Sequence, residues 1–447
     1  MTLPVDKSIM RQSIYENILD LSHEKGINAS GKDDIYGCIF GRDSAITILK
    51  ILKVCKNEYI TSDEEKERLL HICKKGLKAM VDLQGKETNI ESGEEPGKFI
   101  HEYRPDNYER LLQMEKPWYI YPDGIMRNYD SLDSTPLTLI AIFKYWEMTR
   151  DDEFLFSVIS AVESGLNWII TYGDRDKDYL LEYVLPLDRQ HGGLAVQSWT
   201  DSKESMSDSS GNFPEYPIAP VEVQGYAWLA LRLWADYYND KKIHAAKTKR
   251  FAKALSLQAK GLRKQFNKLF IFREGKNYYA AQALDGLKNQ IRTITGNPLL
   301  LFWAAYKKNG KVTSILENKY VPYIVKRAFR EDMFDEDAGI RTMSTSSENY
   351  ISGQNSYHNG SFWPKLNGMS HEGLVNVGFF HEANALKSAT LKPIFYFGSP
   401  IELYVKKDNG EYDIYKNSLG QESCRVQAWS AASALDLLTY KDIQIKL

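Results

Sequence analysis

The feature that most constrains the fold is a helical periodicity of apolar residues, which recurs along nearly the whole 447-residue chain. Apolar side chains at i, i+3, i+4 and i+7 line one face of an α-helix, whereas strands alternate with period two. Strand-like alternation is confined to short pieces such as 269–279. Roughly twelve helices are predicted, over residues 8–24, 44–56, 63–84, 133–149, 152–171, 219–239, 242–266, 297–309, 315–328, 363–376, 380–391 and 426–440.

The intervals between these helices alternate in length. Some are very short, such as 149–152 and 239–242. Long intervals inside a compact chain are usually functional, and the ones here are rich in polar and aromatic residues: 25–43, 85–132, 172–218, 329–362 and 392–425. Helical hairpins with short connections on one face and long loops on the other describe an all-α fold, the (α/α)6 toroid. Since no Pro/Gly/Ser-rich linker divides the chain, we expect residues 1–447 to form a single domain.

Composition excludes several classes of protein. The 57 basic and 59 acidic residues are interspersed and give a net charge of -2, so a nucleic-acid partner is not expected. The N-terminus lacks the features of a signal peptide, and no stretch approaches the ~18 to 20 apolar residues of a membrane span. The four cysteines form no CxxC pair, which fits reduced core thiols. We therefore expect a soluble, cytoplasmic protein without a membrane partner.

The stretch 197–226 combines an indole, an isolated carboxylate and a polar loop ahead of a helical segment. Trp199 beside Asp201 would partly desolvate the carboxyl, and a desolvated carboxyl keeps its proton nearer neutral pH. Asp201 is therefore a candidate catalytic acid, although an aspartate before a helix also serves as an N-cap or loop residue. The 28 Tyr and 9 Trp of the chain give a further hint of a sugar site, since aromatic rings bind the apolar faces of sugars. Buried Tyr and Trp are also ordinary core residues.

Ten sequence blocks, in the same order along residues 37–440, resemble the glucosidase domain of glycogen-debranching enzymes. They are Gly41–Ser44, Gly97–Glu102, Tyr129–Leu137, Trp199–Ser202, Pro217–Tyr226, Gly296–Pro298, Gly339–Ser344, Ser356–Pro364, Pro400–Tyr404 and Gln427–Ser430. The resemblance implies an (α/α)6 barrel related to glucoamylases, neutral trehalases and the mannosylglycerate and glucosylglycerate hydrolases, acting with inversion. It also implies Asp201 as general acid and Glu402 as general base.

Inversion requires the two carboxyls to lie ~6.5–9.5 Å apart, so that a water fits between them. Loops about two hundred residues apart in sequence can supply that separation when both lie at the mouth of one toroid. Glu402 has a less apolar sequence neighbourhood than Asp201, and without the resemblance it would be a solvated loop carboxylate. Glu222 and Glu422 are the main rival carboxylates.

Further substrate-binding candidates lie in the same blocks and elsewhere in the long loops. Arg42 and Asp43 form a donor and acceptor pair suited to the vicinal hydroxyls of a terminal glucose, although they also suit a helix-start ion pair. Glu222 could hold a sugar hydroxyl or orient Arg42. Tyr36, Trp118, Tyr119 and Tyr121 are possible aromatic walls. The remaining candidates around the pocket are His101, Glu102, Asp133, Trp199, Gln224, Tyr357, His358, Asn359 and Trp363.

One departure from the family pattern concerns the residues after Pro364. The family usually continues with His-Asp-Asn, whereas this chain has Lys365-Leu366-Asn367. A changed aglycone preference is one interpretation. Lys365 could meet the carboxylate of an acidic aglycone.

No cofactor is expected, but one acidic turn resembles a metal site. Asp174, Asp176, Asp178 and Glu182 have the alternating oxygen spacing of a calcium loop, although Tyr179 stands where such a loop requires glycine. A solvated acidic turn is the favoured interpretation.

These observations predict an inverting, exo-acting α-glucosidase. The chain starts directly in the helical domain, which favours a small α-glucoside or oligosaccharide stub over a polymer. A glycosylated organic acid, as in glucosylglycerate or mannosylglycerate hydrolases, is an alternative. A glycoside phosphorylase would lack the base carboxylate, and a catalytically inactive sugar-binding toroid would tolerate loss of either one. The sequence leaves the oligomeric state open.

Overall fold

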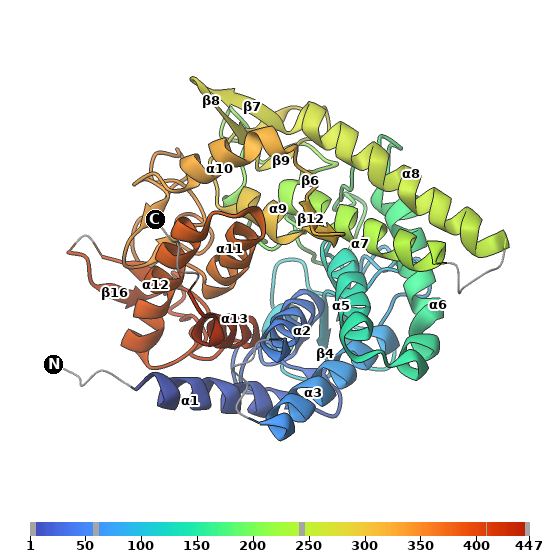
Figure 1. The fold of residues 1–447 in the computed structure, drawn as a ribbon, viewed down its shortest axis with the longest axis horizontal. Coiled ribbons are helices and arrows are strands. Elements are labelled where there is room, and N and C mark those ends of the chain that lie inside the picture. Colours follow the sequence, from blue (N-terminus) through green and yellow to red (C-terminus); the bar gives the residue numbers. More distant parts are fainter. Residues whose placement is uncertain (1–5, 57–61, 241–245, 408, 443–447) are drawn as a thin grey trace.

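The structure is a computed structural model that describes residues 6–56, 62–240, 246–407 and 409–442. Figure 1 shows a helix-rich molecule in which an inner set of helices surrounds the centre and an outer set covers it. The α-helices are α1 Lys7–Asp20, α2 Gly41–Cys55, α3 Asp63–Asp82, α4 Glu109–Leu112, α5 Ser134–Thr149, α6 Asp152–Trp168, α7 Val221–Asn239, α8 Ala246–Leu269, α9 Leu300–Trp303, α10 Val321–Ala328, α11 Pro364–Val377, α12 Phe380–Phe397 and α13 Ala428–Thr439.

The inner helices pack against one another in chain order. Helix α2 packs on α5, α5 on α7, α7 on α9, α9 on α11 and α11 on α13, and α13 also packs on α2. They are buried nearly all round, and α13 is buried along its full length. A helix without a polar face belongs in the interior, which explains why these segments, and not the charged α3 or α8, occupy the inner positions.

The outer helices each cover part of this inner set. Helix α1 packs on α13, α3 on α2, α6 on α5, α8 on α7 and α12 on α11. One hydrophobic cluster contains residues from Met10 of α1 to Leu438 of α13. A shared core therefore connects the two ends of the described chain.

Helix α6 and the π-helical turn Ile169–Gly173 that continues it form one described stretch, Asp152–Gly173, that is long and apolar enough by length and composition to cross a membrane. Core helices pass the same test. Its buried side chains, including Phe154, Val158 and Leu166, belong to the shared core, and the helix packs against α5 and α3.

Strands are short and lie in the loops. They are β1 Ser22–His23, β2 Gly26–Ile27, β3 Ile39–Phe40, β4 Glu102–Arg104, β5 Met126–Asn128, β6 Ala219–Pro220, β7 Ile271–Glu274, β8 Asn277–Ala280, β9 Ala283–Leu284, β10 Gln290–Ile291, β11 Tyr306–Lys308, β12 Lys311–Thr313, β13 Phe334–Asp335, β14 Gly339–Ile340, β15 Tyr404–Lys406 and β16 Tyr412–Ile414. All paired strands run antiparallel within the described residues, and two sheets, β3-β4-β5 and β10-β9-β6, have three strands. Each of these two sheets contains a strand that leads directly into an inner helix: β3 leads into α2, and β6 leads into α7.

Most predicted helices are present, but the one predicted over 297–309 is wrong beyond its first turns. Helix α9 ends at Trp303, and the β11–β12 hairpin follows. Asn309 and Gly310 both have positive φ at the tip, the conformation that an Asn-Gly hairpin turn requires. The predicted helix over 242–266 begins in residues 241–245, which lie outside the described part of the chain.

Candidate active site

A pocket lies where the long loops meet the first turns of inner helices. The space between its walls is about 370 Å³, including the part that is open to solvent. Nine predicted site residues line it: Tyr36, Arg42, Asp43, Trp199, Asp201, Tyr357, His358, Trp363 and Glu402. These residues come from four segments of the sequence that the fold brings together.

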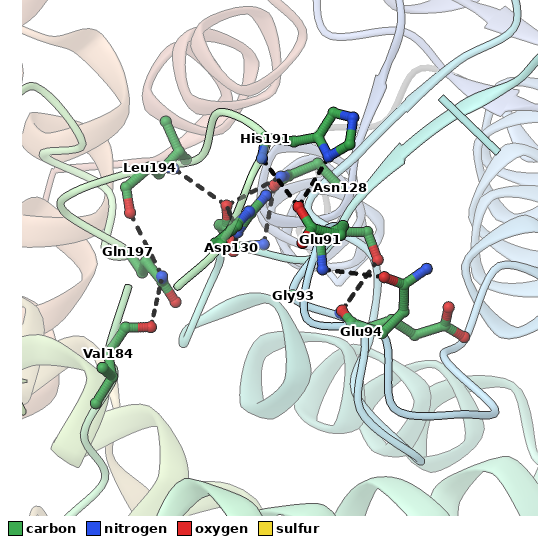
Figure 2. Close-up of polar contacts among 12 residues, drawn as sticks. Glu91, Gly93, Glu94, Asn128, Asp130, Val184, His191, Leu194 and Gln197 are labelled. Atoms are coloured by element: carbon green, nitrogen blue, oxygen red, sulfur yellow. Dashed lines mark hydrogen bonds and ion pairs between the residues drawn. The ribbon is translucent and has the colours of Figure 1, made fainter. Parts of the chain in front are cut away.

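The loop that carries the candidate acid is held by hydrogen bonds to Asp130 and Glu91 (Figure 2). The Asp130 carboxylate accepts the backbone N–H of Leu194 at 3.1 Å, and Glu91 accepts both the backbone N–H and the ring Nδ1 of His191, at 2.9 and 2.8 Å. These contacts fix the loop just before Trp199. The turn that carries Asp201 therefore follows a segment whose position is fixed.

Arg42 is the central ion-pairing residue of the site. Its guanidinium is buried and donates to Asp133 at 2.7 Å, to Asp201 at 2.9 Å and to the carbonyl oxygen of Ser198 at 3.0 Å. Burial disfavours its charge, but the two carboxylates more than compensate and raise its pKa. The predicted Arg42–Asp43 helix-start pair is not formed, because Arg42 faces the loops.

Asp201 lies at the mouth of the pocket with its side chain about one quarter exposed (25%). Burial raises the pKa of this carboxyl above its usual value, and the Arg42 guanidinium opposes the rise. A raised pKa is what a general acid needs. The turn after it is held by His358, whose ring Nδ1 lies 2.9 Å from the Ser202 hydroxyl.

Glu402 is fully buried, whereas the sequence suggested a less apolar neighbourhood. Its Oε1 accepts the hydroxyl of Tyr357 at 2.8 Å, and its Oε2 accepts the backbone N–H of Cys424 at 3.0 Å. Both donors favour the ionised form. Burial outweighs them and raises the pKa of Glu402 to about 7, and the charge of Asp201 adds to the rise. The two candidate carboxyls are therefore electrostatically coupled across one pocket.

Asp43 lies on the first turn of α2 and accepts the side-chain amide of Gln427 at 3.1 Å. Burial raises its pKa to about 7. A carboxyl of this kind can accept a sugar hydroxyl, and the helix N-terminus beside it favours the ionised form.

Three indoles form one wall of the pocket. Trp363 makes edge contacts with Trp199 and Trp429 at centroid distances of 5.7 and 6.0 Å, and the His358 ring stacks on Trp363 at 5.0 Å. Burial keeps the pKa of His358 well below its usual value. This histidine therefore contributes a neutral ring to the wall.

Six residues predicted from the sequence blocks lie outside the pocket lining and contact the loops or the residues that do line it. Asp133 holds Arg42, and the carbonyl of His101 accepts the N–H of Gly41 at 2.9 Å. Glu102 binds Arg104. The others make contacts with backbone or structural side chains: Glu222 with Asn297, Gln224 with Leu181 and Pro220, and Asn359 with Glu204 and Asn349.

The rival carboxylates differ in position. Glu422 is exposed and pairs with Lys416 at 3.5 Å. Glu222 is fully buried below the pocket, where Asn297 links it to the Nε1 of Trp199. Among the other aromatic candidates, Trp118, Tyr119 and Tyr121 do not line the pocket.

Sequence reasoning missed Phe40, Gln427 and Trp429 as lining residues. Gln427 and Trp429 belong to the last sequence block, so their presence in that block was the available signal. Lys365 lies behind the wall and is fully buried. An aglycone carboxylate would have to displace the indoles to reach it.

The acidic turn considered as a calcium site contains an internal cation. Lys288 Nζ lies 2.8, 3.0 and 2.7 Å from carboxylate oxygens of Asp176, Asp178 and Glu182. Asp174, which completes a possible metal cluster, accepts the side-chain amide of Gln258 at 3.0 Å. A metal ion would have to displace this ammonium group.

Comparison with known proteins agrees with the geometry. Residues 118–436 match the family model described as amylo-alpha-1,6-glucosidase. No curated protein sequence matches the chain. An uncharacterized conserved protein from Thermus thermophilus has a similar structure, with a TM-score of 0.64 at 13% identity over 96% of this chain and 99% of that one.

The GH63 mannosylglycerate hydrolase from the same organism is also similar in structure. Its complex with glucose has a TM-score of 0.63 at 14% identity, and its complex with Tris and D-glycerate a TM-score of 0.63 at 15%. Each comparison covers 96% of this chain and 99% of that chain. At such identities the likeness concerns the fold.

Proposed function

The chain belongs to the amylo-alpha-1,6-glucosidase family and is a glycoside hydrolase, and from this premise we propose that it is an inverting, exo-acting α-glucosidase. The single observation that carries the proposal is the shared pocket of Asp201 and Glu402, in which each carboxyl has a distinct set of partners. We further infer a closed (α/α)6 toroid and a single domain. The continuous core and the packing of α13 on α2 support both.

The proposed chemistry uses one proton donor and one proton acceptor. Protonated Asp201 gives its proton to the glycosidic oxygen while the bond from that oxygen to the anomeric carbon breaks. Ionised Glu402 takes a proton from a water, whose oxygen forms the new bond on the opposite face of the ring. Release of the Glu402 proton to solvent and uptake of one by Asp201 restore the enzyme.

Arg42 and Asp133 would hold the acid in place during this cycle. The Arg42 cation favours the anion that Asp201 becomes after donating its proton, and Asp133 balances the cation from the other side. Pre-organised charge of this kind is worth most in a site from which water is excluded.

Exo-action is supported by the shape of the pocket. The pocket is small, so we propose that it holds one sugar ring, against Tyr36, Asp43 and the three indoles that line it. The reacting bond would then join the terminal sugar to a group outside the pocket. A small glucoside or an oligosaccharide stub meets that requirement.

A second candidate is a hydrolase of glucosylglycerate or mannosylglycerate. The similarity to the mannosylglycerate hydrolase structure that contains D-glycerate favours it.

Two other functions are less favoured. A phosphorylase would need a phosphate site in place of a base such as Glu402. A catalytically inactive toroid would have no need for the hydrogen bonds from Tyr357 and Cys424 that hold this carboxylate.

We propose that catalysis needs no cofactor, since carboxyl groups supply every proton transfer. A small-molecule glycoside is the proposed partner. We also propose a cytoplasmic location, supported by four buried cysteines that are all free thiols.

The test is hydrolysis of maltose, isomaltose, trehalose, sucrose, glucosylglycerate and mannosylglycerate, with proton NMR identifying the anomer released first. Initial release of the β-anomer from one substrate, abolished in Asp201→Asn and Glu402→Gln, is expected. Glu422→Gln is the matched control, because this loop carboxylate is exposed and lies outside the pocket. Initial release of the α-anomer would contradict inversion, and turnover only with added phosphate would favour the phosphorylase.

A further inference from the structure

Lys365 is a buried cation that the proposed chemistry does not use. It lies on the first turn of α11, and none of its surface is exposed. Its Nζ has no hydrogen-bond partner among the residues that the structure describes. An ammonium group in such a place loses its hydration, so some other interaction has to favour it.

The interaction that the structure supplies is contact with aromatic faces. Lys365 Nζ lies 3.9 Å from the ring centroid of Trp199 and 5.1 Å from that of Trp429. Both distances are within the ~6 Å range of cation–π attraction, which is strongest for Trp and for desolvated cations. One ammonium therefore contacts two rings of the pocket wall at once.

The three indoles of the wall differ in what else holds them. Trp199 Nε1 donates to Asn297 at 3.1 Å. Trp363 Nε1 donates to the carbonyl of Tyr357 at 3.1 Å and to Ser361 Oγ at 3.0 Å. Trp429 Nε1 is buried and lacks a hydrogen-bond partner within the described chain. Its orientation therefore depends on ring contacts, chiefly with Trp363 and with Lys365.

We propose that Lys365 is a positioning residue for the sugar pocket: its ammonium group holds Trp429 and Trp199 by their faces and so fixes the spacing of the indole wall. The role in sugar binding rests on the proposed glycosidase function, whereas the role in holding the indoles does not. Loss of the cation should weaken binding of the terminal sugar more than it slows the chemical step, because Lys365 acts through the indoles and not through the proposed acid or base.

This arrangement also makes the wall sensitive to pH. Burial lowers the pKa of Lys365 to about 7. Four charged groups act on its ammonium: Arg42 and Asp43 on α2, Asp133 before α5 and Glu222 on α7. His358, in the loop before α11, is also near and is neutral. Above pH 7 the amine becomes neutral, so the attraction to both rings is lost and the wall should loosen.

The first experiment observes the indoles without substrate. Near-UV circular dichroism of the wild-type protein should change with a midpoint near pH 7, and Lys365→Met should lose most of this change while keeping a cooperative thermal unfolding. Lys365→Arg, which keeps a cation, should retain at pH 8 the spectrum that the wild type has at pH 6. An identical transition in wild type and Lys365→Met would overturn the proposal. The wild-type titration needs no variant to fold, and its absence would also overturn it.

The second experiment measures sugar binding in a background where hydrolysis is blocked. Glu402→Gln and Glu402→Gln/Lys365→Met are titrated calorimetrically with the preferred glucoside at pH 6, and the double variant should bind at least tenfold more weakly. The matched control is Lys98→Met in the same background. Lys98 is also buried and lies 5.6 Å from the ring of Trp168, away from the pocket, so its loss should change affinity less than twofold.

The two experiments separate this inference from the proposed function. If no glucoside binds any variant while the near-UV transition depends on Lys365, the glycosidase assignment fails and the positioning of the indoles stands. If glucoside binds equally well with and without Lys365, the positioning role in sugar binding fails and the glycosidase assignment stands.

Discussion

The hydroxyl of Tyr357 donates a 2.8 Å hydrogen bond to Oε1 of Glu402 and lies 3.0 Å from the hydroxyl of Tyr36. A phenol that donates to a carboxylate stabilises its ionised form, the form that a general base requires. The chain of two tyrosines thus connects the pocket wall to the proposed base.

Tyr357→Phe should raise the pKa of Glu402 further, because the carboxylate loses a donor. A hydrogen bond to a charged group contributes about 1.5 kcal/mol or more, which corresponds to about one pKa unit. The acidic limb of kcat/KM should therefore move to higher pH by about one unit. Tyr36→Phe is the control, since the Tyr36 hydroxyl bonds to Tyr357 and not to Glu402, and an equal shift in both variants would contradict the assignment.

The wild-type pH profile should itself show the effect of burial on Glu402. Because the proposed base must be ionised and its pKa is raised to about 7, kcat/KM should increase with pH up to about 7. The increase should approach tenfold per unit well below that value. A profile that is flat between pH 5 and 7 would show that another group acts as base.

Substrates with a good leaving group should separate the two carboxyl roles. Asp201→Asn should lose about 10²- to 10⁴-fold in kcat on an ordinary glucoside. It should lose far less on α-glucosyl fluoride, because fluoride departs with little help from an acid. Glu402→Gln should lose activity on both substrates. The reverse pattern, measured by steady-state kinetics on the same pair, would exchange the two roles.

Asp43→Asn should stabilise the protein at neutral and higher pH. The folded-state pKa of Asp43 is about 7, above the usual value of about 3.9, so the folded state binds the extra proton. The free energy of unfolding therefore falls as pH rises from about 4 to about 7. The substitution should recover up to about 4 kcal/mol at pH 8 and little at pH 4.

Urea unfolding at the two pH values checks the Asp43 prediction. Asp188→Asn, at an exposed loop position, should leave the difference between them unchanged. Equal stabilisation by Asp43→Asn at both pH values would show that the effect comes from packing.

Lys288→Met should convert the acidic turn into a metal-responsive site. Without the ammonium group, Asp176, Asp178 and Glu182 repel one another, and the melting temperature should fall. Millimolar calcium should restore part of that loss in the variant, since carboxylate oxygens are its preferred ligands. The wild-type melting temperature should not respond to calcium or to EDTA, and a response there would contradict the role given to Lys288.

The sequence predicted the fold well where periodicity was long, because inner helices such as α5 and α7 are apolar over several turns. It failed beyond Trp303, where an Asn-Gly turn at Asn309 competes with helical periodicity in a short segment. Whether this segment forms a helix or a hairpin depends on its packing against α7, which a local sequence pattern does not encode.

The candidate site was predictable only as far as its residues lie in recognisable motifs. Trp199, Asp201 and Glu402 were found in this way and lie together in the pocket. Gln427 was not identified as lining the pocket, since its partner Asp43 is 384 residues away in sequence. The sequence around Lys365 likewise gave no indication that its ammonium contacts two indole rings. Those rings belong to Trp199 and Trp429, which lie in other segments of the chain.

The packing of α13 on α2 has a consequence for synthesis on the ribosome. Early domains and segments generally fold first as the chain emerges, but Tyr36 and Asp43 must wait for Gln427 and Trp429 before the pocket has all its walls. Contacts of such high sequence separation form late. A nascent chain in which α2 to α11 are already helical would thus still be unable to bind a sugar. Ligand binding would therefore begin only after α13 has packed against α2.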